Sequence, residues 1–216
     1  MYRLAIFDFD GTLADSFPCF LEALNAAAAR YGFRGIDARD LDALRGLGSW
    51  QVMERLEIPL WQVPMITAFV RRRMGERASD VKLFPGVHEA VEDLVANGVT
   101  LAIVTSNSEA SVRGILGDRL ASLVQDYRCD VSIFGKRPRL RQALAATRTA
   151  ADDAIVIGDE LRDLKAARAE GIAFGGVCWG FTLPGALRAA EPELMFERVD
   201  DIAPALAMRA SRPLPA

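Results

Sequence analysis

Two carboxylates, Asp8 and Asp10, stand directly after a short apolar run at residues 4–7. Such a run is typical of a buried strand, and ligands of α/β proteins bind outside the carboxyl ends of the strands. Gly11 follows and permits the tight turn that such an edge requires. Because neighbouring carboxylates repel each other, we expect a bound cation or a shared proton between them. The segment therefore predicts a metal site.

Three further candidate strands are followed by polar side chains: residues 101–104, 129–134 and 155–157. The side chains concerned are Thr105, Ser106, Asn107, Lys136, Asp159, Glu160 and Asp163. The carboxyl ends of parallel strands meet at one edge of a sheet. We therefore expect several carboxylates, a hydroxyl and an ammonium group to converge in one crevice with Asp8 and Asp10.

This set of groups suits phosphoryl transfer. Carboxylate oxygens are ligands that Mg²⁺ prefers, and Mg²⁺ also binds phosphate oxygens. One carboxylate can attack phosphorus and form an aspartyl-phosphate, while a second protonates the leaving group and later deprotonates water. Lys136 would hold both the nucleophile and the phosphoryl oxygens. Thr105 and nearby backbone N–H groups would hydrogen-bond the same oxygens and stabilise charge in the transition state.

Strands and helices alternate from residue 83 onward, which predicts an α/β fold with a Rossmann-like parallel sheet. We expect residues 1–15 and 83–210 to form this core and residues 16–82 to form an inserted all-helical cap domain that overhangs the carboxylate edge. The tail at residues 211–216 is expected to be disordered. The helices predicted in the cap span residues 17–31, 37–45 with Asp37 as N-cap, 49–56 and 61–77.

The composition restricts the class of protein. The chain has 216 residues and a formal net charge of −3, so nothing suggests a nucleic-acid partner. Its three cysteines match no zinc spacing, and its one histidine excludes a histidine-rich metal site. No uncharged run approaches the ~20 residues of a membrane span, and the early acids leave no signal-peptide core. We expect a cytoplasmic monomer or homodimer with neither membrane nor nucleic acid as partner.

Four segments, in order, resemble the motifs of the haloacid dehalogenase (HAD) superfamily. They are residues 8–13, residues 104–107, Gly135-Lys136 with Pro138, and residues 158–163. Residues 163–171 and 176–181 are also similar to phosphoglycolate phosphatase-like members. The resemblance covers nearly the whole core and implies the phosphatase branch with a helical cap after the first motif. One departure is that the third motif, usually Lys-Pro-x-Pro, is Lys-Arg-Pro-Arg at residues 136–139.

The resemblance implies a role for each matching residue. Asp8 would be the nucleophile and Asp10 the general acid and base, while Thr105 and Lys136 would bind the phosphoryl group. In the cap, the glycines beside Arg45 free the backbone, and this arginine is a candidate partner for an anionic substrate group. The residues expected to contact substrate are Gly11, Thr12, Ser106, Asn107 and Arg45; Asn107 is also a candidate start of the next helix.

The implied cofactor is Mg²⁺. The side chains of Asp8 and Asp159, with the carbonyl of Asp10, would hold it. Glu160 is a further candidate ligand, or else places negative charge at a helix N-terminus. Asp163 would support the metal site directly or through water, or else caps the first turn of the helix.

The leading hypothesis is a Mg²⁺-dependent phosphomonoester hydrolase that acts on a small phosphorylated metabolite through an aspartyl-phosphate. The alternative is a sugar phosphomutase similar to β-phosphoglucomutase, which would use the same residues but retain the phosphoryl group. Dehalogenation is disfavoured because Asp10 supplies a proton that a halide does not need. Phosphonate cleavage is disfavoured because the cap has no lysine before Lys82 to form a Schiff base. A non-catalytic binding protein would not require the intact set of acids and lysine.

Overall fold

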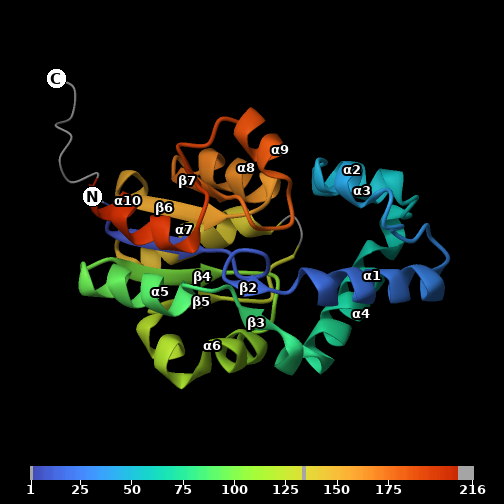
Figure 1. Cartoon of the computed structure of the whole chain (residues 1–216), viewed down its shortest axis with the longest axis horizontal. Helices are drawn as coiled ribbons and strands as arrows, with labels where there is room; N and C mark the ends of the chain where they lie inside the picture. The colour runs from blue at the N-terminus through green and yellow to red at the C-terminus, as the bar shows by residue number, and fades with distance from the viewer. Residues whose placement is uncertain (1, 133–134, 209–216) are drawn as a thin grey trace.

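The computed structural model describes residues 2–132 and 135–208, in which a six-stranded sheet has the order β5-β4-β1-β6-β7-β8 (Figure 1). All of its neighbouring strands are parallel. The strands are β1 (Leu4–Phe7), β4 (Thr100–Val104), β5 (Asp126–Arg128), β6 (Ala154–Gly158), β7 (Ala173–Val177) and β8 (Leu194–Phe196). The α/β fold predicted from the sequence is confirmed.

The strand β1 lies in the middle of the sheet, and its register aligns the ends of its two neighbours. Phe7 lies opposite Ile103 of β4 on one side and Ile157 of β6 on the other. The residues that follow these three strands therefore emerge at the same level, at the carboxyl edge. This register brings the acids after β1 beside the polar residues that follow β4 and β6.

The side chains of β1 alternate between two apolar cores, as the pleat of a strand requires. Ala5 and Phe7 belong to the core on the side of α5, α6 and α10, whereas Leu4 and Ile6 belong to the core on the side of α7, α8 and α9. Figure 1 shows α5 and α6 below the sheet and α8 and α9 above it. These helices are α5 (Val87–Ala96), α6 (Glu109–Leu123), α7 (Lys136–Thr147), α8 (Leu161–Ala169), α9 (Pro184–Ala189) and α10 (Ile202–Met208).

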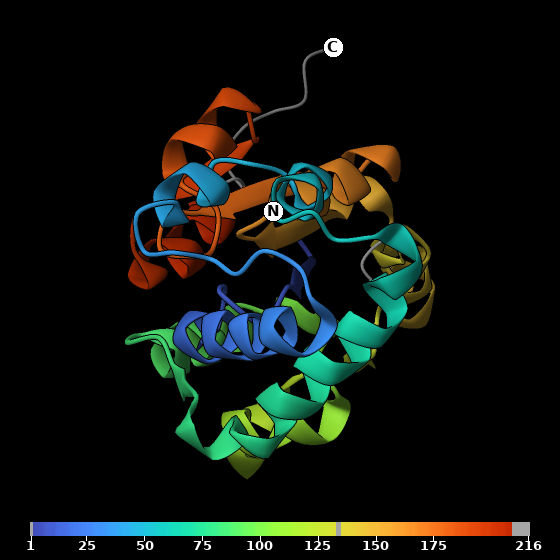
Figure 2. The ribbon, with the colours of Figure 1, turned by 90° about the vertical axis from the view of Figure 1, so that its right-hand side faces the viewer.

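Four helices after β1 lie beyond the carboxyl edge of the sheet (Figures 1 and 2). They are α1 (Phe17–Tyr31), α2 (Leu41–Arg45), α3 (Ser49–Arg55) and α4 (Val63–Glu76), and we call them the cap. They share an apolar cluster of their own. The antiparallel pair β2 (Ala14–Asp15) and β3 (Lys82–Leu83) lies where the chain passes into the cap and returns from it. Among the helices described, none has the length and apolarity needed to cross a bilayer.

Two elements differ from the sequence-based expectation. The prediction of a strand at residues 129–134 is wrong. The strand β5 ends at Arg128, and the backbone turns at Asp130, where φ is 55°. Residues 133–134 of that expected strand and the tail at 211–216 lie outside the described residues. The second cap helix begins at Leu41 and not near Asp37, because the Asp37 side chain accepts the backbone N–H of Arg39 and forms a turn.

The cores predict a contrast between two leucine truncations. Leu140 of α7 is fully buried against the sheet, whereas Leu60 is 58% exposed. Leu140→Ala should lower the free energy of unfolding by about 2–5 kcal/mol. The matched control Leu60→Ala should change it by less than about 1 kcal/mol. Urea denaturation measures both, and equal losses would contradict the placement of α7 on the sheet.

Candidate active site

The residues after β1 form the centre of the site. Asp8 is buried at the end of the strand, where its backbone N–H donates to the carbonyl of Ile157. Its carboxylate accepts the backbone N–H of Phe9 at 2.8 Å. Gly11, with φ at 79°, then turns the chain away from the sheet. A Cβ at this position would lie 2.5 Å from a carboxylate oxygen of Asp159, so the turn needs glycine for space as well as for conformation.

Three buried carboxylates come together from two strand ends. Asp8 follows β1, Asp159 follows β6, and Asp163 lies in the first turn of α8. One oxygen from each lies within 4.8 Å of the others. Gly158 makes this possible, because a Cβ there would lie 2.6 Å from an oxygen of Asp163. Three oxygen donors at this spacing fit a hard divalent cation such as Mg²⁺.

Lys136, the first residue of α7, places its buried ammonium group between two of these acids. Its Nζ lies 2.9 Å from Asp8 Oδ2 and 2.6 Å from Asp163 Oδ1. Burial alone would lower the pKa of Lys136, but the two carboxylates raise it. Burial would likewise raise the pKa of Asp8, but the positive charges of Lys136 and Arg162 lower it. Asp8 is therefore held as the carboxylate, the form that can act as a nucleophile.

Asp159 and Asp163 add negative charge to the cluster that the positive charge of Lys136 does not fully neutralise. Burial raises the pKa of Asp159 well above its usual value, and the negative charges of Glu160, Asp8 and Asp163 add to this effect. Burial also raises the pKa of Asp163, to about 7, although Lys136 opposes it. A divalent cation between these oxygens would compensate the excess negative charge.

Asp159 is oriented by residues from two distant loops. The Thr12 hydroxyl donates to Asp159 Oδ1 at 2.8 Å, and the backbone N–H of Phe181 donates to Oδ2 at 2.7 Å. A Cβ on Gly180 would lie 2.0 Å from the Asp159 Cβ, so only glycine at this position allows the loop to lie this close to Asp159. Thr12 was expected to contact substrate, but its hydroxyl donates its hydrogen bond to Asp159. The roles of Gly180 and Phe181 were not predicted, although both lie in the segment 176–181 that resembles the family.

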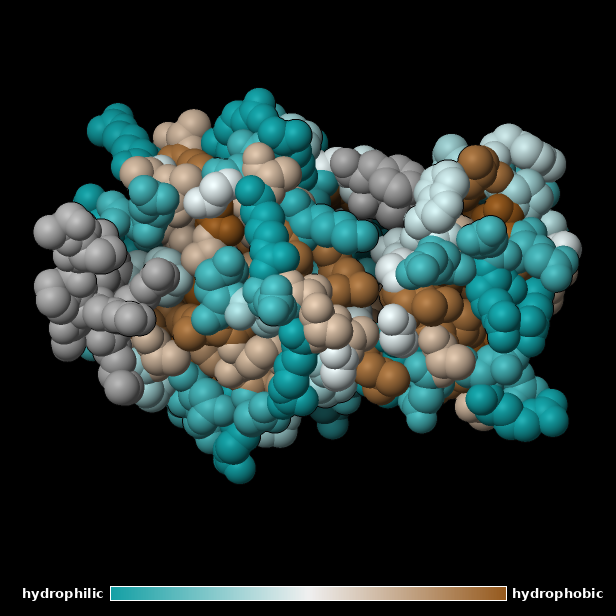
Figure 3. Space-filling view, turned by 90° about the horizontal axis from the view of Figure 1, so that it is seen from above, coloured by the Kyte–Doolittle hydropathy of each residue, from teal (hydrophilic) through white to brown (hydrophobic). Residues whose placement is uncertain are grey.

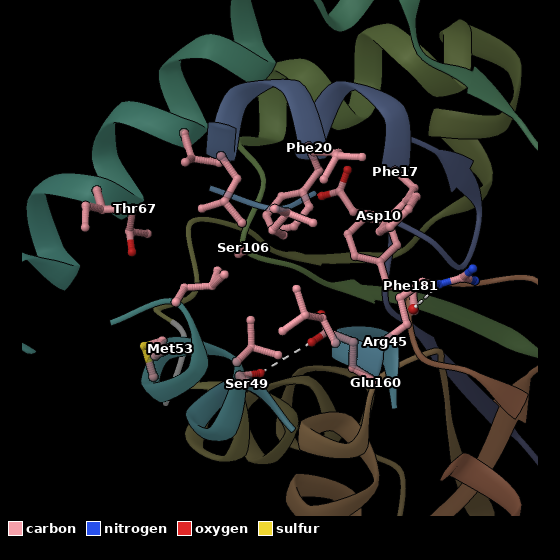
Figure 4. Close-up of a pocket in the computed structure, with 18 of the residues that line it drawn as sticks. Asp10, Phe17, Phe20, Arg45, Ser49, Met53, Thr67, Ser106, Glu160 and Phe181 are labelled. Carbon is pink, nitrogen blue, oxygen red and sulfur yellow. Dashed lines mark hydrogen bonds between the residues drawn. The ribbon is translucent and has the colours of Figure 1, made fainter. Parts of the chain in front are cut away.

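Asp10 faces a different environment from Asp8. It is half-buried and lines a cavity beneath the cap (Figure 4). The Asn107 amide donates to Asp10 Oδ1 at 3.4 Å. Burial, together with the charge of Asp8, raises the pKa of Asp10 to about 6, although the hydrogen bond from Asn107 opposes this shift. A carboxyl group that titrates near neutral pH suits both the donation and the acceptance of a proton.

The segment after β4 lies beside the two acids of the first motif. Thr105 is fully buried, and its hydroxyl oxygen accepts the backbone N–H of Asn107 at 3.1 Å. Ser106 and Asn107 line the cavity. The N-cap of α6 is Ser108 and not Asn107: its side chain accepts the backbone N–H of Ser111.

Two further predicted site residues, Glu160 and Arg45, also contact protein groups in this structure. Glu160 lies outside the three-carboxylate cluster of the described residues and forms an ion pair with Arg162. Arg45 lines the cavity, but its Nε and Nη2 donate to the carbonyl oxygens of Phe181 and Gly180, each at 2.9 Å. Arg45 therefore fastens α2 to the loop that orients Asp159, and its contact with a substrate anion stays a prediction.

Arg162 was not predicted as a site residue, although it lies inside the fourth motif. Burial alone would lower the pKa of Arg162, but the carboxylates of Glu160, Asp163 and Asp8 raise it, so it stays charged. Its Nε is buried and has no hydrogen-bond partner among the described residues. An arginine one position before a motif aspartate was the only signal that could have identified it.

A family model described as haloacid dehalogenase-like hydrolase matches residues 5–177, and the chain belongs to this family. It is 34% identical over 198 residues to a phosphoglycolate phosphatase of Synechococcus elongatus, covering 91% of this chain and 93% of the relative. It is 28% identical to a 5'-nucleotidase of Pseudomonas aeruginosa, and the match covers 88% of this chain and 89% of the relative. A solved haloacid dehalogenase-like protein from Streptococcus pneumoniae has a similar fold, with a TM-score of 0.78, 21% identity and coverage of 94% and 98%. The chain is a phosphatase of the haloacid dehalogenase type.

The raised pKa of Asp10 predicts a pH-dependent effect of Asp10→Asn on stability. An acid whose pKa rises on folding, here from 3.8 to about 6, destabilises the folded state once pH exceeds these values. In EDTA, Asp10→Asn should therefore raise the free energy of unfolding by about 1–3 kcal/mol at pH 7.5 and by little at pH 4. Chemical denaturation measures this, with Asp118→Asn on the exposed surface of α6 as control. If the free energies of unfolding of Asp10→Asn and wild type differ by the same amount at both pH values, the raised pKa of Asp10 is contradicted.

Proposed function

We propose that this phosphatase is a Mg²⁺-dependent phosphomonoester hydrolase that forms an aspartyl-phosphate on Asp8. One observation carries the proposal: a buried carboxylate, Asp8, in contact with the ammonium group of Lys136, belongs to a three-acid cluster. A second acid, Asp10, stands two residues along at the wall of a cavity. The role of nucleophile is thereby assigned to Asp8, which also belongs to the proposed cation site, and the role of proton donor is assigned to Asp10.

The proposed reaction has two displacements at phosphorus. An oxygen of Asp8 attacks, the phosphorus–oxygen bond to the leaving group breaks, and Asp10 gives its proton to the departing oxygen. Asp10 then takes a proton from water, whose oxygen attacks the aspartyl-phosphate and regenerates Asp8. Lys136, the hydroxyl of Thr105 and the Nε–H of Arg162, which has no hydrogen-bond partner among the described residues, would stabilise the phosphoryl oxygens.

The proposed cation is held by the side chains of Asp8 and Asp159, with Asp163 beside them. The carbonyl of Asp10 is the further ligand that the family resemblance implies. Bound Mg²⁺ would neutralise charge on the phosphoryl oxygens. Support comes from the spacing of the three acids and from the two hydrogen bonds that orient Asp159.

The metal proposal predicts that Mg²⁺ stabilises the folded protein. A ligand present at about 100 times its dissociation constant adds about 2.7 kcal/mol to the free energy of unfolding. Thermal unfolding should therefore shift upward on addition of MgCl₂ to the EDTA-treated protein. Asp159→Asn should abolish the shift, and the exposed control Asp118→Asn should keep it. A shift that survives in Asp159→Asn would contradict this ligand set.

The activity proposal predicts that Asp8→Asn removes turnover, because the amide cannot form the aspartyl-phosphate. We expect a loss of at least about three orders of magnitude in phosphate release with Mg²⁺ present. EDTA should reduce the wild-type rate to a similar level, and Asp118→Asn should retain full activity. Activity that is unaffected by EDTA or by Asp8→Asn would refute the mechanism.

The mutase alternative differs in its product. Incubation with a hexose phosphate would yield an isomeric sugar phosphate in place of free phosphate. The cap helices line the described cavity mainly with apolar side chains, which favours the hydrolase over a sugar mutase.

The proposed partner is a small phosphorylated metabolite, and the proposed assembly is a monomer or homodimer. Nucleic acid and membrane are not proposed as partners, in keeping with the net charge of −3. The proposed location is the cytoplasm, which agrees with three cysteines that are all free.

A further inference from the structure

An apolar cavity lies between the cap and the carboxylate cluster (Figure 4). Its volume is about 250 Å³. All four cap helices contribute leucine, isoleucine, valine, methionine or phenylalanine side chains. Representative lining residues are Phe20, Leu24, Leu44, Val52, Ile66 and Val70. The space-filling view also shows apolar surface between the cap and the rest of the molecule (Figure 3).

The cavity begins at the catalytic acids. Asp10, Ser106 and Glu160 belong to its lining, and Figure 4 shows Asp10 beside Phe17 while Thr67 and Met53 lie toward the opposite end. The Phe181 ring contacts the ring of Phe17, with centroids 4.9 Å apart. In the proposed mechanism Asp10 protonates the leaving oxygen. The leaving group must therefore extend from the Asp10 side of the phosphorus atom, which is the side of the cavity.

The charges in the cavity lining do not suit an anionic leaving group. Among the described lining residues, the positively charged ones are Arg45, Arg71 and Arg162. Arg45 donates to two backbone carbonyls, and Arg71 contacts Asp130 at 3.3 Å and the carbonyl of Val131 at 3.4 Å. Arg162 is paired with Glu160 at the phosphoryl end. A carboxylate on the leaving group would lose water without gaining an unpaired cation.

We propose that the substrate is a phosphomonoester whose leaving group is an uncharged, apolar alkyl or aryl alcohol that occupies this cavity. The inference rests on the proposed function and adds the substrate class to it. An apolar cavity of about 150 Å³ accepts benzene, so about 250 Å³ accommodates roughly ten carbon atoms. The apolar lining stabilises such a group by excluding it from water.

The test is the rate of phosphate release from linear alkyl phosphates with four, six, eight and ten carbons, and from phosphoglycolate. The alkyl leaving groups have the same reactivity at oxygen, so differences report binding in the cavity. Each methylene group should raise kcat/KM about three- to fourfold. Decyl phosphate, kept below its micelle concentration, should exceed butyl phosphate at least about a hundredfold, and phosphoglycolate should be poorer than hexyl phosphate.

A matched pair of variants on α4 locates the effect. Thr67 lines the cavity, whereas its neighbour Ala68 is exposed. Thr67→Trp should fill the cavity and lower kcat/KM for decyl phosphate at least about tenfold more than it lowers kcat/KM for butyl phosphate. Ala68→Trp should leave both values unchanged.

The outcomes separate this inference from the proposed function. A flat dependence on chain length, or a preference for phosphoglycolate, overturns the apolar substrate class even though turnover shows the hydrolase to be active. Equal effects of the two tryptophan variants on decyl phosphate also overturn it. Release from no ester above the Asp8→Asn background would overturn the hydrolase itself.

Discussion

The placement of one ammonium group among buried acids is the constraint on which the rest of the site depends. Lys136 Nζ lies 2.9 Å from Asp8 and 2.6 Å from Asp163, and all three side chains are buried. A buried pair of this kind is tolerated only when its geometry is close and the partners are held rigidly. The structure supplies that rigidity by mounting Asp8 on the central strand, Lys136 at the start of α7 and Asp163 in the first turn of α8.

Glycines set how closely these elements approach. Gly11, Gly158 and Gly180 each face an aspartate of the cluster at a distance that no Cβ could occupy. The loop that carries Gly180 also reaches the cap, because Arg45 donates to the carbonyls of Gly180 and Phe181. One loop therefore orients Asp159 and holds α2. This short segment therefore contacts both the cap and the three-carboxylate cluster.

Asp8 and Asp10, which a single residue separates in the sequence, acquire different properties because their surroundings differ. Asp8 lies against Lys136, which lowers its pKa, whereas burial raises the pKa of Asp10 to about 6 at the cavity wall. This difference supports the nucleophilic role proposed for Asp8 and the proton-transfer role proposed for Asp10. The apolar cavity extends from Asp10 into the cap, and the cap is therefore the part of the chain that we propose selects the leaving group.

Local signals in the sequence were sufficient for the fold class and for the acids and lysine of the core, because apolar strand runs and the residues that follow them are contiguous in the chain. They placed Asp8, Asp159 and Lys136 at one sheet edge. They did not reveal that the Thr12 hydroxyl donates to Asp159 or that Arg45 attaches α2 to the loop at Gly180. They also did not reveal the ion pair between Arg162 and Glu160. The strand expected at 129–134 lies instead at Asp126–Arg128. The contacts of Thr12 and Arg45 join residues 147 and 135 positions apart in the sequence. The sequence did not predict the apolar cavity either, because the cavity is lined by helices whose relative positions are decided only by tertiary packing.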